Sequence, residues 1–128
     1  MVNYLAVLVA AVAGYAFGTI WYMSLAKPWI AAVGFAEPPK PKPIPMITAF
    51  VAQLVMAYML AGALGHLGDV SVLAGLITAA LIWVGFVATT MTVNHRFQGA
   101  KWKLTFIDAG HWLGVMLVMG VVLGLFGA

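Results

Sequence analysis

Four long apolar runs, separated by three polar breaks, organise this chain. The runs cover residues 2–24, 46–65, 72–94 and 104–126. A helix of about 20 apolar residues is long enough to cross the hydrocarbon core of a bilayer. The pattern therefore predicts an all-α integral membrane protein, a four-helix bundle in a single domain that covers residues 1–128.

The composition agrees with lipid as the main solvent of the chain. Hydrophobic residues make up 65% of the sequence and charged residues only 7%, whereas soluble domains carry about a quarter charged residues. The chain has no cysteine, which excludes disulfides and thiolate metal sites. Its few cations are divided between two breaks and do not form a patch, so we expect no nucleic-acid partner.

The first break, residues 27–45, contains all six prolines of the chain. Pro28 is suited to the first turn of a short helix, which we expect to lie on the membrane surface. The following segment, 37–45, favours an extended polyproline II conformation. It is interpreted as a stiff spacer, with a ligand for a partner's groove as the alternative.

The distribution of cations predicts the topology. All six lysines and arginines lie in the first and third breaks: Lys27, Lys40, Lys42, Arg96, Lys101 and Lys103. With four spans, these two breaks lie on one side of the membrane, and the positive-inside rule places that side in the cytoplasm. We therefore expect antiparallel neighbouring helices and both termini outside.

Small residues recur at helical spacing in the first and last runs. Ala6, Ala10, Gly14 and Gly18 form one row, and Gly110 with Gly114 forms a G-x-x-x-G pair. Such rows let helix backbones approach closely in membranes. Because a single four-helix bundle can use all of these faces only if it is very tightly packed, we expect a homo-oligomer, most simply a homodimer.

Asp108 is the only carboxylate inside an apolar run, and His111 follows three residues later on the same helical face. Gly110 and Gly114 are expected to point roughly the opposite way. An acid in a membrane span is costly and is a functional-site hypothesis by default. The alternative is structural, with Asp108 only locking the last two helices together.

Further polar or amphipathic side chains are expected in the same half of the membrane. They are Thr90 and Asn94 in the third run, Gln53 in the second, and Trp21 with Tyr22 in the first. We expect Asp108 to point into the bundle and to bond some of His111, Asn94, Thr90 or Trp21. These residues are the candidates for a polar cleft in the cytoplasmic half.

Three segments also resemble a known family. They are the opening NYLAVLVAAVAGYAFGTIWYMSLAKPWI, then GFVATTMTVNHRF, then KLTFIDAGHWLGVMLVMGVVLGLF. Together they are similar to domain-of-unknown-function family 1761, small bacterial four-helix membrane proteins. The resemblance implies a bacterial inner-membrane protein and brings no activity, cofactor or catalytic residues. The proline-dense first break departs from the helical linker expected of that family.

Three function classes remain open. The first is a homo-oligomeric binding or scaffold module with a cleft for a lipid headgroup or apolar molecule, in contact with membrane lipids. The second is a small secondary transporter in which Asp108 and His111 carry a coupled proton. A membrane enzyme with His111 as base ranks last, because no nucleophile, second carboxylate or metal set accompanies it. We expect no metal and no cofactor.

Overall fold

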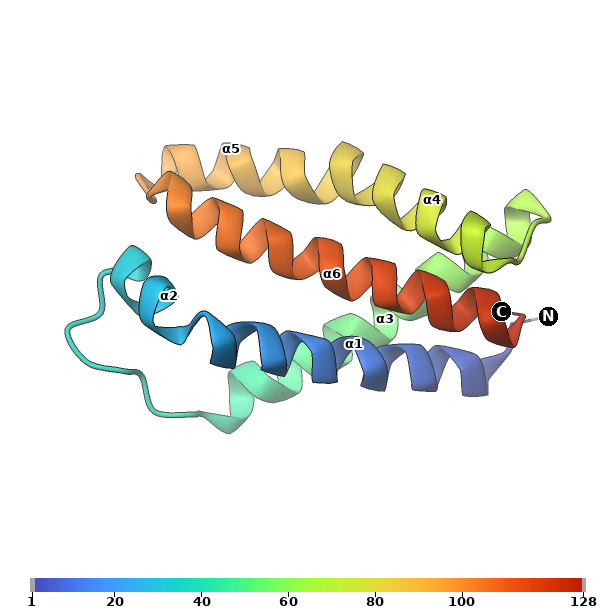
Figure 1. Cartoon of the computed structure of the whole chain (residues 1–128), viewed down its shortest axis with the longest axis horizontal. Helices are drawn as coiled ribbons and strands as arrows, with labels where there is room; N and C mark the ends of the chain where they lie inside the picture. The colour runs from blue at the N-terminus through green and yellow to red at the C-terminus, as the bar shows by residue number, and fades with distance from the viewer. Residues whose placement is uncertain (1, 128) are drawn as a thin grey trace.

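A computed structural model describes residues 2–127, and all regular structure within them is helical. The elements are α1 (Tyr4–Ser24), α2 (Ala26–Val33), α3 (Pro43–Leu67), α4 (Val72–Ile82), the π-helix η1 (Trp83–Ala88), α5 (Thr89–Phe97) and α6 (Trp102–Phe126) (Figure 1). Because α4, η1 and α5 follow one another without a break, the described residues hold four helices long and apolar enough to cross a membrane. The chain is all-α, as its sequence predicts.

The helix ends follow from local chemistry. The side chain of Asn3 accepts the N–H of Ala6 at 3.1 Å, and Ser71 accepts that of Ala74 at 3.1 Å, which satisfies donors that the first helical turn leaves free. The third element, α3, begins at Pro43, inside the segment expected to be extended. Prolines are tolerated in a first turn because their missing N–H needs no partner there.

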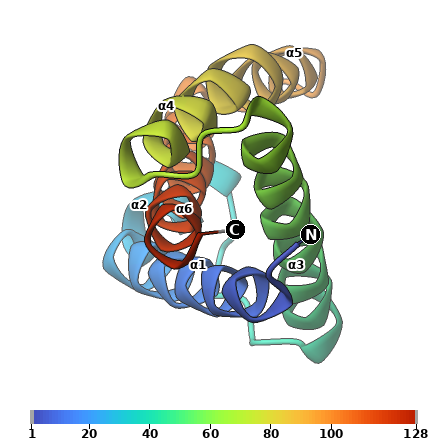
Figure 2. The same cartoon turned by 90° about the vertical axis from the view of Figure 1, so that its right-hand side faces the viewer.

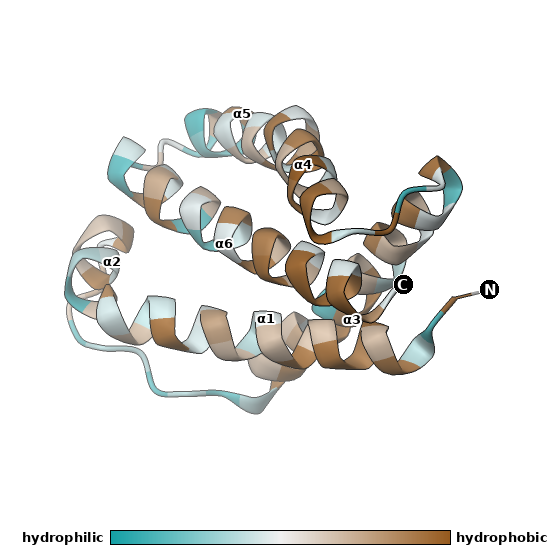
Figure 3. Cartoon of the chain, turned by 45° about the vertical axis from the view of Figure 1, so that its right-hand side comes forward, coloured by the Kyte–Doolittle hydropathy of each residue, from teal (hydrophilic) through white to brown (hydrophobic). Residues whose placement is uncertain are grey.

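Both described chain ends lie at one end of the bundle, together with the turn between α3 and α4 (Figure 1). At the opposite end lie α2, the segment 34–42 and the turn 98–101; we call this the loop end. Figure 3 shows hydrophobic residues along the long helices and hydrophilic residues gathered mainly near their ends. This distribution suits helices whose middle portions face lipid.

Helix α6 is the central element of the bundle. It packs against α1 and against α4, while α3 packs against α1 and touches α4 and α6 (Figure 2). The core is apolar, and its fully enclosed side chains include Leu64, Val115, Met119 and Leu123. The helices that flank α6 therefore contribute to one continuous core.

Glycines set the distance between α4 and α6. A β-carbon built on Gly75 would lie 2.7 Å from the carbonyl carbon of Gly120, which is closer than real atoms approach. Near the other end of this contact, a β-carbon on Gly124 would lie 2.5 Å from the carbonyl carbon of Ser71. The two backbones thus touch because these positions have no side chain.

The row of small residues on α1 is buried within the same chain: Ala6, Ala10, Gly14 and Gly18. On α6, Gly114 faces the ring of Phe17, and a β-carbon on Gly110 would lie 3.0 Å from the ring of Trp21. The expectation that Gly110 and Gly114 point away from the polar face of α6 is therefore wrong, since both face α1. Aromatic rings of α1 fill the space beside both glycines, so the glycines give no argument for a dimer.

Candidate functional site

The carboxylate of Asp108 is held by α1. The hydroxyl of Tyr22 donates a hydrogen bond of 2.6 Å to its Oδ1 atom, and both residues are half-buried. None of the four expected partners takes this place in the described residues. Trp21 instead donates from Nε1 to the backbone oxygen of Ile107 at 3.0 Å. Asp108 is thus turned towards the end of α1, where the adjacent residues Trp21 and Tyr22 each donate a hydrogen bond to α6.

His111 lies one turn deeper in the bundle and is 5% exposed. Its ring centroid is 4.7 Å from that of Tyr22 and 4.5 Å from that of Trp112. A β-carbon on Gly18 would lie 2.6 Å from its Nε2 atom, so the ring fits only because residue 18 has no side chain. Its Nδ1 atom is buried without a hydrogen-bond partner among residues 2–127.

Gln53 lies deeper still, and its side chain is 2% exposed. A β-carbon on Gly14 would lie 3.1 Å from its Oε1 atom and equally far from side-chain atoms of Val115 and Met119. It therefore faces α1 and α6 inside the bundle, one helical turn of α1 beyond the level of His111. Its Oε1 atom has no hydrogen-bond partner in the part of the chain that the structure describes.

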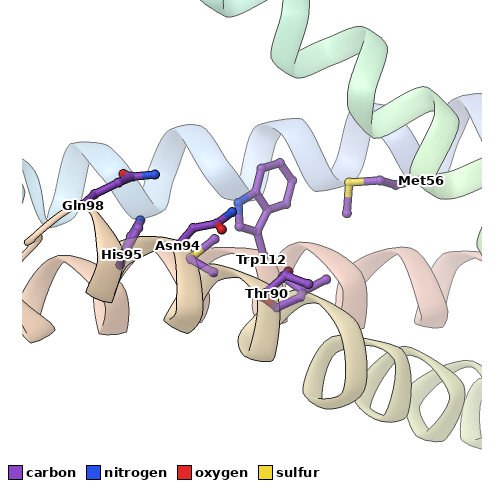
Figure 4. A pocket seen from close by; sticks show the side chains of 8 residues that line it. Met56, Thr90, Asn94, His95, Gln98 and Trp112 are labelled. Atoms are coloured by element: carbon purple, nitrogen blue, oxygen red, sulfur yellow. The ribbon is translucent and has the colours of Figure 1, made fainter.

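Thr90 and Asn94 lie elsewhere, in the wall of an open cleft of about 410 Å³. Helices α3 and α6 and the segment formed by η1 and α5 supply the lining: Met56, Val87, Thr90, Met91, Asn94, His95, Gln98 and Trp112 (Figure 4). The predicted site residues are thus divided between two places. Trp112 connects them, because its ring meets His111 on one side and lines the cleft.

The π-helix contributes to the shape of this wall. Three threonines follow it, and their hydroxyls donate to backbone oxygens one turn back: Thr89 to Gly85 at 2.9 Å, Thr90 to Phe86 at 2.5 Å, and Thr92 to Ala88 at 2.6 Å. A π-helix has a wider turn than an α-helix, and such segments are frequent at functional sites. Here the segment supplies Val87 to the cleft, directly before α5 supplies Thr90.

A second polar cluster lies next to the cleft, and its residues are not among the site residues predicted from the sequence. The Nδ1 atom of His95 is 2.7 Å from the Thr105 hydroxyl oxygen, and Nη2 of Arg96 donates to the same oxygen at 2.8 Å. Nη2 also donates to the backbone oxygen of Ala100 at 2.9 Å, and the guanidinium carbon lies 3.5 Å from the ring centroid of Trp102. The sequence feature that could have predicted this cluster is the short turn between the third and fourth apolar runs, because a short turn brings the residues on its two sides together.

Comparison with known proteins identifies the family. A family model described as "Protein of unknown function (DUF1761)" matches residues 5–124. The chain belongs to this family. No curated protein and no solved structure matches it. The family assignment accords with the resemblance found in the sequence and carries no activity.

Proposed function

We propose that this protein is a membrane-embedded binding module whose cleft takes a small amphipathic molecule from the bilayer. The observation that carries the proposal is the cleft itself, of about 410 Å³ and lined by three of the four spans. Volumes of this order suit small-molecule sites. Among the described residues α3 and α5 do not contact each other, so the cleft separates them.

The polarity of the cleft changes along its length. Asn94, His95 and Gln98 lie together at one end, and Met56 lies at the other, with Thr90 and Trp112 between them (Figure 4). The side-chain amides of Asn94 and Gln98 are exposed and therefore accessible to a ligand. No Lys, Arg, Asp or Glu is among the lining residues. This arrangement favours a ligand with an uncharged polar head and an apolar body.

The cations support an orientation for the cleft. All six lysines and arginines of the chain lie at the loop end or in the helix ends beside it. By the positive-inside rule this end faces the cytoplasm, with antiparallel spans and both termini outside. The polar part of the cleft then lies in the cytoplasmic half of a bacterial inner membrane. A homodimer stays a prediction, without support from the small-residue rows.

Native mass spectrometry of the protein in mild detergent tests the binding function, because it detects a molecule that co-purifies with the chain. The variant Val87→Trp fills the cleft, and we expect it to lose that molecule. Thr89→Ala is the matched control, since Thr89 is exposed and does not line the cleft. A molecule retained equally by both variants would show that binding occurs outside the cleft.

Proton-coupled transport is the second candidate, because the ring of His111 touches Trp112 in the cleft wall and has a buried nitrogen without a partner among residues 2–127. Reconstituted vesicles with a pH gradient test this reading with the molecule found by mass spectrometry. The transport hypothesis requires that Asp108→Asn abolish uptake driven by the gradient and leave binding intact. Uptake that does not respond to the gradient in the unaltered protein would exclude it.

A further inference from the structure

Hydrogen bonds beside the polar end of the cleft join Arg96, Thr105 and His95. We propose that Arg96 and Thr105 hold His95 with its single ring proton on Nε2, so that the cleft selects a molecule whose head carries a carbonyl oxygen. This inference rests on the proposed binding function and names the ligand class for the same cleft.

The direction of these hydrogen bonds is set first by Arg96. A guanidinium group has only donors and keeps its charge in proteins. The Thr105 oxygen at 2.8 Å from Nη2 must therefore be the acceptor of that bond. Arg96 is itself held in place by the backbone oxygen of Ala100 and by the ring of Trp102, so the first donor of the relay is fixed.

The Thr105 hydroxyl has one proton left to donate. Five of the other six threonine hydroxyls donate to a carbonyl oxygen one turn back: Thr19, Thr48, Thr89, Thr90 and Thr92. Within residues 2–127, Thr105 makes no such bond, and its two partners are Arg96 and His95. Because Thr105 is only 3% exposed, solvent does not compete, and its proton goes to Nδ1 of His95.

A nitrogen that accepts a hydrogen bond carries no proton. With Nδ1 as acceptor, neutral His95 has its proton on Nε2. Nδ1 faces Thr105 on α6, and Nε2 is the remaining polar atom of a ring that lines the cleft. The cleft thus receives a donor at this position.

The neighbours of His95 complete the recognition site. The amides of Asn94 and Gln98 can each donate as well as accept, and the rest of the cleft is apolar towards Met56. A carbonyl oxygen accepts from Nε2–H, whereas a protonated amine head would place one donor against another. Quinone rings and lipid esters both carry such an oxygen on an apolar body, so the ligand class is a membrane-soluble carbonyl compound.

Nuclear magnetic resonance tests the relay without any ligand. The full chain with ¹⁵N-labelled histidine in lipid nanodiscs has three side chains to assign, His66, His95 and His111. We expect His95 to appear as the Nε2–H tautomer, and Thr105→Val to change its tautomer signals. Thr89→Val is the matched control and should leave them unchanged, because among residues 2–127 the Thr89 hydroxyl bonds only the backbone oxygen of Gly85. A proton on Nδ1 of His95 in the unaltered protein would overturn the relay.

Binding measurements test the ligand class. The probes are a short-tailed quinone, a monoacylglycerol, an alkane and an alkylamine of matched length. We expect the carbonyl probes to bind about 5- to 10-fold tighter than the other two, with the preference lost in Thr105→Val and kept in Thr89→Val. The order of quinone and monoacylglycerol then distinguishes the two sources of the carbonyl.

The outcomes separate this inference from the binding function. Equal affinity for all four probes, lost together in Val87→Trp, would support the cleft as a binding site and reject the carbonyl preference. If neither carbonyl probe binds, the ligand class assigned here is wrong. Loss of the co-purified molecule in Val87→Trp would still support the cleft in that case.

Discussion

Tyr22 and Asp108 form a hydrogen bond of 2.6 Å that joins the last turn of α1 to α6. An acid in a membrane span requires a polar partner, because an unpaired acid in hydrocarbon is costly. The hydroxyl of Tyr22 is that partner, and neither residue lines the cleft. This separation from the cleft favours a structural role for Asp108.

The first prediction concerns Asp108. Asp108→Asn keeps an acceptor for the Tyr22 hydroxyl, so the free energy of unfolding should change by less than about 1 kcal/mol. Asp108→Leu leaves the hydroxyl without an acceptor and should lower the free energy of unfolding by about 1–3 kcal/mol. Unfolding curves of both variants in detergent measure this difference.

Tyr22→Phe is the control for this pair, since it removes the donor and keeps the ring beside His111. In the Tyr22→Phe background, the difference between Asp108→Asn and Asp108→Leu should shrink. If Asp108→Asn destabilised the protein as much as Asp108→Leu, the hydrogen bond would not explain the stability.

The second prediction concerns the contact between α4 and α6. Gly120→Ala adds a methyl group where the backbone of Gly75 already lies in contact. Overpacking of this kind typically costs about 1–3 kcal/mol of unfolding free energy. Gly62→Ala is the matched control, because in the described part of the chain no atom outside the local helix backbone lies within 4 Å of the added carbon. It should be neutral or slightly stabilising, and equal melting of the two variants would contradict the close approach.

The third prediction distinguishes folding from association. Because Gly114 faces Phe17 of the same chain, Gly114→Leu should lower the melting temperature whatever the oligomeric state. Native mass spectrometry at a temperature below melting should show the same stoichiometry for the variant and the unaltered protein. A stable variant that changes only from dimer to monomer would instead place Gly114 in an interface between chains.

The fourth prediction concerns orientation. Alkaline phosphatase is active only outside the cytoplasm, so a fusion at the C-terminus of the chain should be active. A fusion in the turn 98–101 should be inactive, because Arg96, Lys101 and Lys103 surround that turn. The reverse pattern of activity would show that the cations do not determine the topology of this protein.

Part of this structure was determined by the sequence alone. Four apolar runs of sufficient length leave helices as the way to satisfy backbone hydrogen bonds in lipid, so the all-α class with four long apolar helices follows from composition and length. The family could also be predicted from the sequence, because the segments that resemble it cover most of the chain. The burial of Gln53 could also be anticipated, since an amide exposed to hydrocarbon is costly.

The tertiary structure decided which side chains meet. Helical spacing places Asp108 and His111 on one face of α6, but it gives neither the crossing of α1 nor the rotation of α6 about its axis. The crossing and the rotation together place Tyr22 beside Asp108. They also place Thr90 and Asn94 in the wall of a separate cleft. The crossing of α1 and the rotation of α6 depend on the packing of several helices at once, including close contacts such as that between Gly75 and Gly120. The periodicity of one helix contains no information about those contacts.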